Sequence, residues 1–108
     1  MTFEELRTNL KKLNCEIKSD AVAFYFEVVF SEELRPVLET CLTDYFGLPL
    51  KAANQPPTPE SDACAGRYGG AKTNQTVYTK KGDGSVVDVA LIWPWNAGGR
   101  YTLKLVRG

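Results

Sequence analysis

Residues that commonly perform catalysis or bind metal are few in this chain. Its 108 residues include three cysteines, Cys15, Cys41 and Cys64, and no histidine, the side chain used most often as a general base and as a metal ligand. A cysteine becomes a nucleophile when a neighbouring base or cation lowers its pKa, and these cysteines have neither CxxC spacing nor a histidine. We therefore predict no catalytic, cofactor-binding or metal-binding residues, and we favour a protein that is not an enzyme.

Two of the thiols have different predicted environments. Cys41 lies on the apolar face of a predicted helix, which is typical of a buried core thiol. Cys64 lies in a long irregular segment, three residues before Arg67. An exposed thiol without a base is chemically reactive but is not a catalyst.

The segment 66–73 contains glycines, a lysine and a threonine, as phosphate-binding loops do. In a P-loop, four residues separate the glycines and a Gly-Lys-Ser/Thr sequence opens a helix. Here the glycines are spaced differently and a strand is expected to follow, so we predict a flexible hinge. Gly82-Asp83-Gly84 lacks the further acidic ligands of a calcium loop and predicts only a turn.

The tripeptide Trp93-Pro94-Trp95 is the most distinctive aromatic feature. Trp93 continues an apolar strand row and is expected in the core. Trp95 follows the proline, at the head of a glycine-rich turn, where it either caps the core or forms an aromatic and basic rim with Arg100. Arg67 and Tyr68 are candidates for the same rim.

Hydrophobic periodicity predicts the elements that position these residues. Apolar spacings of three and four, with Thr2 and Glu5 as a capping box, predict a helix over 3–14. A second helix is predicted from Ser31 to Phe46, with Pro36 in its first turn and Gly47 ending it. Runs rich in β-branched and aromatic residues predict four strands, at 21–30, 75–81, 85–93 and 100–107.

Together these elements predict one α+β domain spanning residues 1–108. The predicted order is α-β-α-β-β-β, a two-layer sandwich with both helices on one face of a four-stranded, mainly antiparallel sheet. A long irregular loop, about 48–74, precedes the three-strand meander. Composition agrees with a single globular domain, because 44% of the residues are apolar and 24% are charged.

The side of the sheet that each residue occupies decides where a partner would bind. We predict that Val22, Phe24, Phe26, Val28 and Phe30 face the helices. The opposite face would then carry Tyr25, Tyr78, Ile92 and Lys104, which is more apolar than a solvated sheet face requires. Such a face predicts a docking surface or a homodimer interface, unless the 48–74 loop covers it.

Charge is distributed unevenly although the formal net charge is zero. Residues 1–63 hold eleven acidic and six basic side chains, and residues 64–108 hold two acidic and seven basic ones. The two parts therefore carry net charges of −5 and +5. This polarity either holds the two parts together or orients an acidic partner.

The start of the chain and its cysteine content favour a cytoplasmic location. Residues 1–5 are acidic rather than basic, and the apolar run 21–30 is too short to cross a bilayer and contains Glu27. An odd number of widely spaced cysteines predicts reduced thiols. We expect no membrane association.

The leading hypothesis is a small non-catalytic interaction or regulatory domain. It would bind a protein partner, or a second copy of itself, through the open sheet face. The predicted contact residues are Tyr25, Tyr78, Ile92, Trp95, Arg100 and Lys104.

Two alternatives remain open at this point. One is nucleic-acid binding by the basic meander, with contacts at Tyr78, Lys80, Trp95, Arg100 and Lys104. The other is an enzyme or ligand-binding domain whose pocket lies under the 49–74 loop, with candidate residues Cys64, Arg67 and Tyr68.

Overall fold

A computed structural model describes residues 2–65, 73–81, 86–95 and 98–107. Within these residues, three α-helices and one short 3-10 helix accompany five strands. The helices are α1 (Phe3–Lys11), η1 (Glu32–Leu34), α2 (Arg35–Phe46) and α3 (Pro59–Ala65). The strands are β1 (Glu16–Val22), β2 (Tyr25–Ser31), β3 (Thr76–Lys81), β4 (Val87–Pro94) and β5 (Arg100–Arg107).

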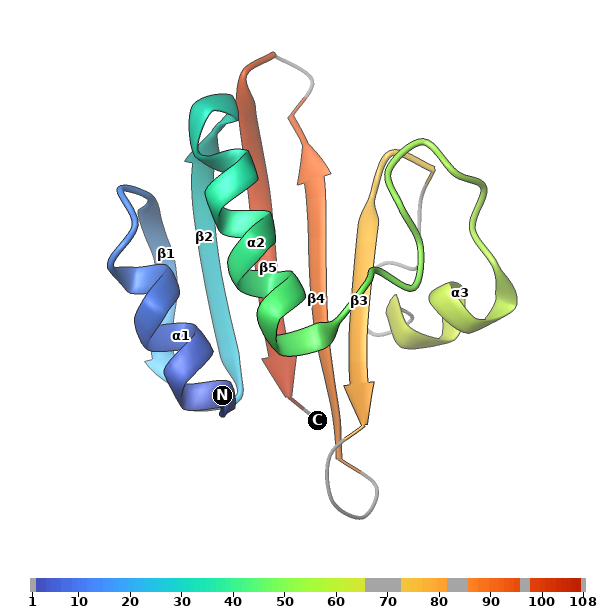
Figure 1. Cartoon of the computed structure of the whole chain (residues 1–108), viewed down its shortest axis with the longest axis horizontal. Coiled ribbons are helices and arrows are strands. Elements are labelled where there is room, and N and C mark those ends of the chain that lie inside the picture. The colour runs from blue at the N-terminus through green and yellow to red at the C-terminus, as the bar shows by residue number, and fades with distance from the viewer. Residues whose placement is uncertain (1, 66–72, 82–85, 96–97, 108) are drawn as a thin grey trace.

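The strands form one antiparallel sheet in the order β1-β2-β5-β4-β3 (Figure 1). The C-terminal strand β5 therefore lies at its centre, between β2 and β4. Both α1 and α2 lie on the same side of this sheet, the side that faces the viewer in Figure 1. We call this side the helix face and the opposite side the outer face.

The signals at the start of α1 and at both ends of α2 are confirmed, but α1 ends at Lys11 rather than at residue 14, and a 3-10 turn precedes α2 where a continuous helix from Ser31 was predicted. Thr2 and Glu5 form the reciprocal capping box, and Phe3, Leu6 and Leu10 are buried on one face of α1. Pro36 lies in the first turn of α2, where its missing N–H leaves no intrahelical bond unmade. At the other end of α2, Gly47 adopts a φ of 82°, which favours glycine.

The main core lies between these helices and the sheet. Strands β2 and β5 contribute alternate residues, because successive side chains of a strand point to opposite faces. The buried residues of this core are Phe3, Leu6, Leu10, Phe26, Val28, Phe30, Leu38, Leu42, Tyr45, Tyr78, Ala90, Ile92, Leu103 and Leu105.

A second, smaller apolar cluster lies on the outer face. It consists of Val77, Val89, Leu91 and Val106, all at most 5% exposed. Leu50, from the segment between α2 and α3, packs against it. The long segment predicted to be irregular thus contributes to a core, and it also contains the helix α3, which contacts β3 and β4.

The prediction of four strands is wrong, because residues 16–31 form a hairpin of two strands. The chain turns at Ala23 and Phe24, near the start of the apolar run 21–30 that was expected to be one strand. Strand β1 is polar and lies at the sheet edge, and its register with β2 shifts twice. An edge strand exposed on both sides shows no alternating pattern, which explains why its sequence did not identify it.

Two assignments of side chains to faces are also corrected. Val22 and Phe24, predicted to be core residues, are 41% and 60% exposed because they lie at the hairpin end. In β3 and β4 the predicted faces are inverted. Tyr78 and Ile92 face the helices, whereas Trp93, predicted in the core, faces outward with Leu91 and is only partly buried. Strand β4 is apolar on both faces, so alternation within it could not indicate which side faces the helices.

Candidate functional site

The register of the three strands β2, β5 and β4 arranges their outward side chains in rows across the outer face. One row places Glu27 opposite Lys104, and Lys104 opposite Leu91. The next row places Val29 opposite Thr102, and Thr102 opposite Trp93. Side chains far apart in the sequence thereby become neighbours on one surface.

Within these rows, aromatic and charged side chains remain accessible over β2, β5 and the end of β4. Trp95 is 41% exposed and the Arg100 side chain is 58% exposed, while the other members are partly buried. We call this surface the open patch, and its residues are Tyr25, Glu27, Trp93, Trp95, Arg100 and Lys104.

The open patch has a floor of small side chains. Val29 is 3% exposed and Thr102 is 6% exposed, although both point away from the helices. The Thr102 hydroxyl accepts a 2.8 Å hydrogen bond from the Trp95 indole nitrogen. This bond fixes the orientation of an exposed aromatic ring, so less side-chain freedom is lost when a partner packs on it.

Both cations of the open patch lie against its tryptophans. The Lys104 ammonium is 5.3 Å from the ring centre of Trp93, and the Arg100 guanidinium is 6.0 Å from that of Trp95. Such contacts are weakly attractive at exposed sites. They hold the charged groups over the aromatic surface without neutralising them.

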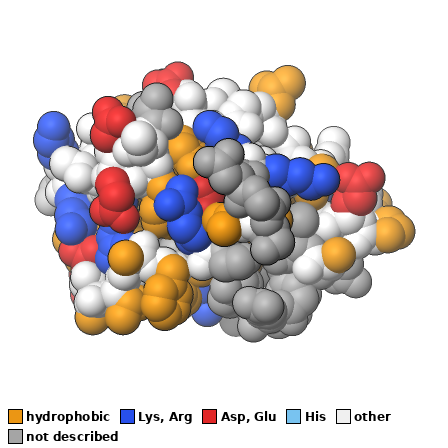
Figure 2. Space-filling view, turned by 90° about the horizontal axis from the view of Figure 1, so that it is seen from below, with side chains coloured by type: hydrophobic (Ala, Val, Ile, Leu, Met, Phe, Trp, Pro, Cys, Tyr) orange, Lys and Arg blue, Asp and Glu red, His pale blue; other side chains and the backbone are white. Residues whose placement is uncertain are grey.

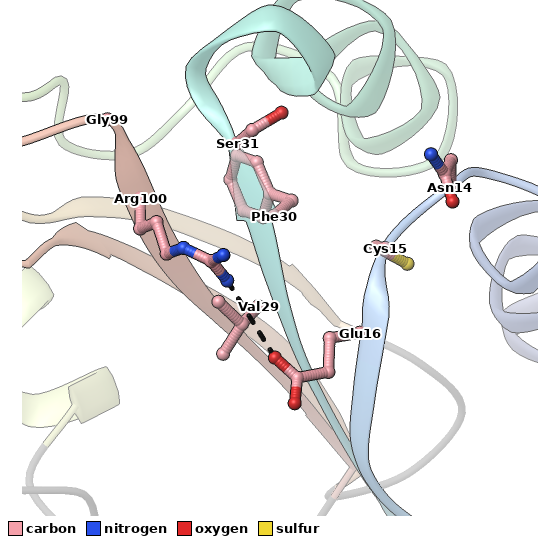
Figure 3. A pocket seen from close by; sticks show the side chains of 8 residues that line it. All are labelled: Asn14, Cys15, Glu16, Val29, Phe30, Ser31, Gly99 and Arg100. Atoms are coloured by element: carbon pink, nitrogen blue, oxygen red, sulfur yellow. Dashed lines mark ion pairs between the residues drawn. The ribbon is translucent and has the colours of Figure 1, made fainter.

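A cavity of about 470 Å³ opens beside Arg100, at one end of the open patch. Figure 3 shows Arg100 from β5 and Glu16 from β1 extending toward each other across Val29. Their Nη1 and Oε2 atoms are 3.9 Å apart. The cavity is lined by Asn14, Cys15, Glu16, Val29, Phe30, Ser31, Gly99 and Arg100.

Glu16 is engaged mainly by a neighbour on its own strand. Its Oε1 atom accepts a 2.9 Å hydrogen bond from Lys18. This bond and the charge of Lys18 lower the pKa of the Glu16 carboxyl, so it is ionised at neutral pH. Figure 3 shows the sulfur of Cys15 pointing away from the ion pair, so the thiol takes no part in it.

The open patch continues into an apolar hairpin end. Residues 21–24, Ala-Val-Ala-Phe, are all exposed. In the view from below, hydrophobic side chains gather on the side of the molecule where this hairpin lies (Figure 2). Four consecutive exposed apolar residues are unusual on a soluble surface and are typical of a contact site.

The buried side chain of Arg7, from helix α1, holds this hairpin in place. It is 6% exposed, and its nitrogens donate to Asp20 Oδ1 at 2.8 Å, the Ala23 carbonyl at 2.9 Å and the Tyr25 carbonyl at 3.3 Å. Hydrogen bonding from Lys11 and from Arg7 lowers the pKa of the Asp20 carboxyl. The hairpin therefore presents Tyr25 in a fixed position at one end of the open patch.

A buried lysine anchors the segment that packs over the other part of the outer face. Lys51 is 2% exposed, and its ammonium donates to the carbonyl oxygens of Ala52, Thr73 and Gln75 at 3.1, 2.9 and 2.5 Å. Its backbone also pairs with Val77 of β3. Burial lowers the pKa of the Lys51 amine. Nothing in the local sequence pattern predicted this role.

On the helix face, Asp88 is the centre of a second polar network that the sequence did not reveal. Asp88 is 1% exposed and accepts hydrogen bonds from Arg107, at 2.8 and 3.1 Å, and from Tyr45. Desolvation opposes ionisation, but these hydrogen bonds outweigh it and lower the pKa of the Asp88 carboxyl. We assign this network a structural role.

The structure brings together four of the six predicted contact residues. Tyr25, Trp95, Arg100 and Lys104 lie in the open patch. Tyr78 and Ile92 do not, since each is 3% exposed within the main core beneath the helices. The prediction that these two residues line the open face is therefore wrong. Glu27 also lies in the open patch, as its alternation with Tyr25 predicted. Only the strand register places Trp93 in the open patch and Glu16 beside it.

The predicted loop candidates have a different outcome. Arg67 and Tyr68 lie outside the described residues, and Cys64 lies in α3. Burial raises the pKa of the Cys15 and Cys41 thiols, which disfavours the reactive thiolate. Within the part of the chain that the structure describes, no three His, Cys, Asp or Glu side chains are grouped to hold a metal ion.

Comparisons with protein-family models, with curated proteins and with solved structures found no match to this chain. None of the described helices is long and apolar enough to cross a bilayer.

Proposed function

We propose that this protein is a non-catalytic interaction domain that binds a protein partner through the open patch. One observation carries the proposal: two tryptophans and two cations share the outer face of the sheet, next to an exposed apolar hairpin end. Tryptophan, tyrosine and arginine are enriched among the residues that dominate binding energy at protein interfaces. The partner is another protein or a second copy of this chain.

Nucleic-acid binding receives less support from the same geometry. Trp95, Arg100 and Lys104 do lie together, as that hypothesis requires. Lys80, however, lies 4.2 Å from the ring centre of Tyr45 on the helix side, and Tyr78 is buried. Three of the five proposed contacts therefore remain on one surface.

Partner capture by matched variants tests the proposed function. Trp95→Ala removes an exposed indole from the open patch, and Val37→Ala removes an exposed apolar side chain, 50% exposed, from α2. We expect Trp95→Ala to weaken binding of a captured protein at least tenfold and Val37→Ala to leave it unchanged. Circular dichroism should show that both variants keep the fold.

Self-association is measured in parallel by sedimentation equilibrium. If the partner is a second copy, Trp95→Ala should shift a dimer to monomer while Val37→Ala does not. Equal binding by wild type and Trp95→Ala in both experiments would overturn the proposal.

A further inference from the structure

The charged groups of the open patch differ in how far they are already engaged. Its two nearest carboxylates have hydrogen-bond donors: Glu27 accepts a 2.5 Å bond from the Tyr25 hydroxyl, and Glu16 accepts one from Lys18. The cations are not engaged in the same way. Among the described residues, neither the Arg100 nor the Lys104 side chain donates a hydrogen bond, and the Lys104 ammonium has no carboxylate within 4.0 Å.

The only carboxylate near Arg100 within the described chain is held at a distance. The 3.9 Å separation between Arg100 and Glu16 is an ion pair without a hydrogen bond. A guanidinium presents five N–H donors in a planar fork that matches a carboxylate. Arg100 therefore keeps its capacity for a bidentate partner while it faces a cavity of about 470 Å³.

The local charge balance also favours an anion. Lys18, Arg100 and Lys104 face Glu16 and Glu27 over this part of the outer face, which leaves a net charge of +1. The cavity adds the hydroxyl side chain of Ser31 and the amide side chain of Asn14 to its lining. Both side chains can donate hydrogen bonds to a carboxylate oxygen.

We propose that the partner segment recognised by the open patch is an acidic peptide that also carries apolar side chains. One of its carboxylates binds Arg100 at the cavity, a second interacts with Lys104, and its apolar groups pack on Trp93 and Trp95. This inference rests on the proposed function and specifies the chemistry of the partner.

A peptide fits this surface better than a nucleic acid does. Glu27 and Glu16 lie among the cations, and each would repel a phosphate placed beside it. A nucleic-acid backbone carries a negative charge at every nucleotide. A peptide can space its carboxylates to meet Arg100 and Lys104 and place neutral residues over the two glutamates.

Tryptophan fluorescence provides a direct test, because both tryptophans of the chain belong to the open patch. The probes are an end-blocked hexapeptide of alternating Glu and Leu, the same peptide with Gln in place of Glu, and a thymidine tetranucleotide. The Glu peptide and the tetranucleotide each carry three negative charges. We expect a saturable spectral shift with the Glu peptide, at least about tenfold weaker binding of the Gln peptide, and weakening by added salt.

Two variants locate the interaction. Arg100→Gln should reduce the affinity for the Glu peptide to that for the Gln peptide. Lys81→Gln is the matched control, because it removes one exposed cation from the end of β3, outside the open patch. This control should leave the affinity within about twofold, as expected for a distant, screened charge.

Several results would overturn the inference. They are equal affinity for the Glu and Gln peptides, no saturable response to the Glu peptide at millimolar concentration, tighter binding of the tetranucleotide, or equal losses in the Arg100→Gln and Lys81→Gln variants. A captured partner that depends on Trp95 but is insensitive to salt and to Arg100→Gln would refute the acidic segment and leave the proposed function standing.

Discussion

The two parts of the outer sheet face differ in how far their side chains are exposed to solvent. Over β3 and β4, Val77, Val89 and Leu91 are at most 5% exposed, and Leu50 packs against them. Over β2 and β5, long aromatic or charged side chains accompany the small buried residues Val29 and Thr102. Arg100, and Trp95 beside this part, remain accessible. The boundary runs between direct neighbours, because fully buried Leu91 pairs with partly exposed Lys104.

Among the described residues, a segment of the chain covers the outer face over β3 and β4 but does not extend over β2 and β5. Where the segment after α2 packs on the sheet, the outward residues are aliphatic, as in a core. Where it does not, a floor of Val29 and Thr102 lies beneath amphipathic side chains that tolerate both water and a partner. The open patch is therefore a surface suited to reversible binding.

The largest effect on stability should come from a substitution in the covered part of the outer face, over β3 and β4. Leu91→Ala removes a fully buried side chain and should lower the free energy of unfolding by about 3 kcal/mol, through lost burial and the cavity left behind. Urea denaturation measures the change. Its neighbour supplies the control: Lys104→Ala should change stability by less than about 0.5 kcal/mol. Similar losses in both variants would contradict the distinction between the two parts.

The next largest loss of stability is expected at Lys51, which anchors the segment covering β3 and β4. Lys51→Met keeps the side-chain length but leaves three carbonyl oxygens without their donor. We expect a loss of about 2 kcal/mol in unfolding free energy, together with faster proteolysis within residues 48–58. Lys81→Met, at an exposed position, is the control and should behave as wild type. Unchanged proteolysis in Lys51→Met would show that the segment is held by other contacts.

A substitution of Arg7 tests whether partner binding by the open patch depends on the contacts between α1 and the β1–β2 hairpin. Arg7→Lys keeps the charge but loses the fork that contacts Asp20 and two carbonyl oxygens. We expect about 1–2 kcal/mol of destabilisation, since Asp20 is partly exposed, and weaker partner binding through a displaced Tyr25. Full retention of binding by a destabilised Arg7→Lys protein would show that the hairpin is not part of the contact surface.

We expect the contribution of Asp88 on the helix face to the free energy of unfolding to depend on pH in the acid range, whereas Glu27 on the outer face should contribute little. The pKa of Asp88 is lowered on folding, so its contribution is present above its ordinary pKa of 3.8 and is lost as the pH falls through the folded value. We expect Asp88→Asn to lower the free energy of unfolding by about 1 kcal/mol at pH 7. The difference in unfolding free energy between this variant and wild type should become smaller below about pH 4. Glu27→Gln, in the open patch, is the control and should change stability little at either pH.

A difference between wild type and Asp88→Asn that stayed constant from pH 7 to pH 3 would contradict this account of Asp88. Urea denaturation at the two pH values provides the measurement. Because Arg107, the partner of Asp88, is partly exposed, the expected effect is smaller than for Leu91→Ala.

Local signals predicted the first two helices and the C-terminal strands, but not α3, since capping, proline and glycine act through the residues beside them. Thr2, Pro36 and Gly47 each act within one turn of the helix they begin or end. The face of a strand depends instead on residues far away in the sequence. Ile92 and Leu91 are both apolar, and only the pairing of β4 with β3 and β5 places them on opposite sides.

The candidate site was predicted in part for the same reason. Trp95, Arg100 and Lys104 lie in or beside one strand, so local alternation and composition indicated them. Glu16 and Trp93 join them through pairing across the sheet. The functions of Lys51 and Arg7 depend on backbone carbonyls of distant segments, which no residue pattern encodes.

The most direct test of the proposal that the open patch binds a partner is amide chemical-shift mapping by NMR with the partner recovered by capture. The account predicts that the perturbed amides concentrate around Tyr25, Glu27, Thr102 and Lys104, with little change at Val77 and Val89. Perturbations concentrated on β3, or on α2 around Val37, would contradict it.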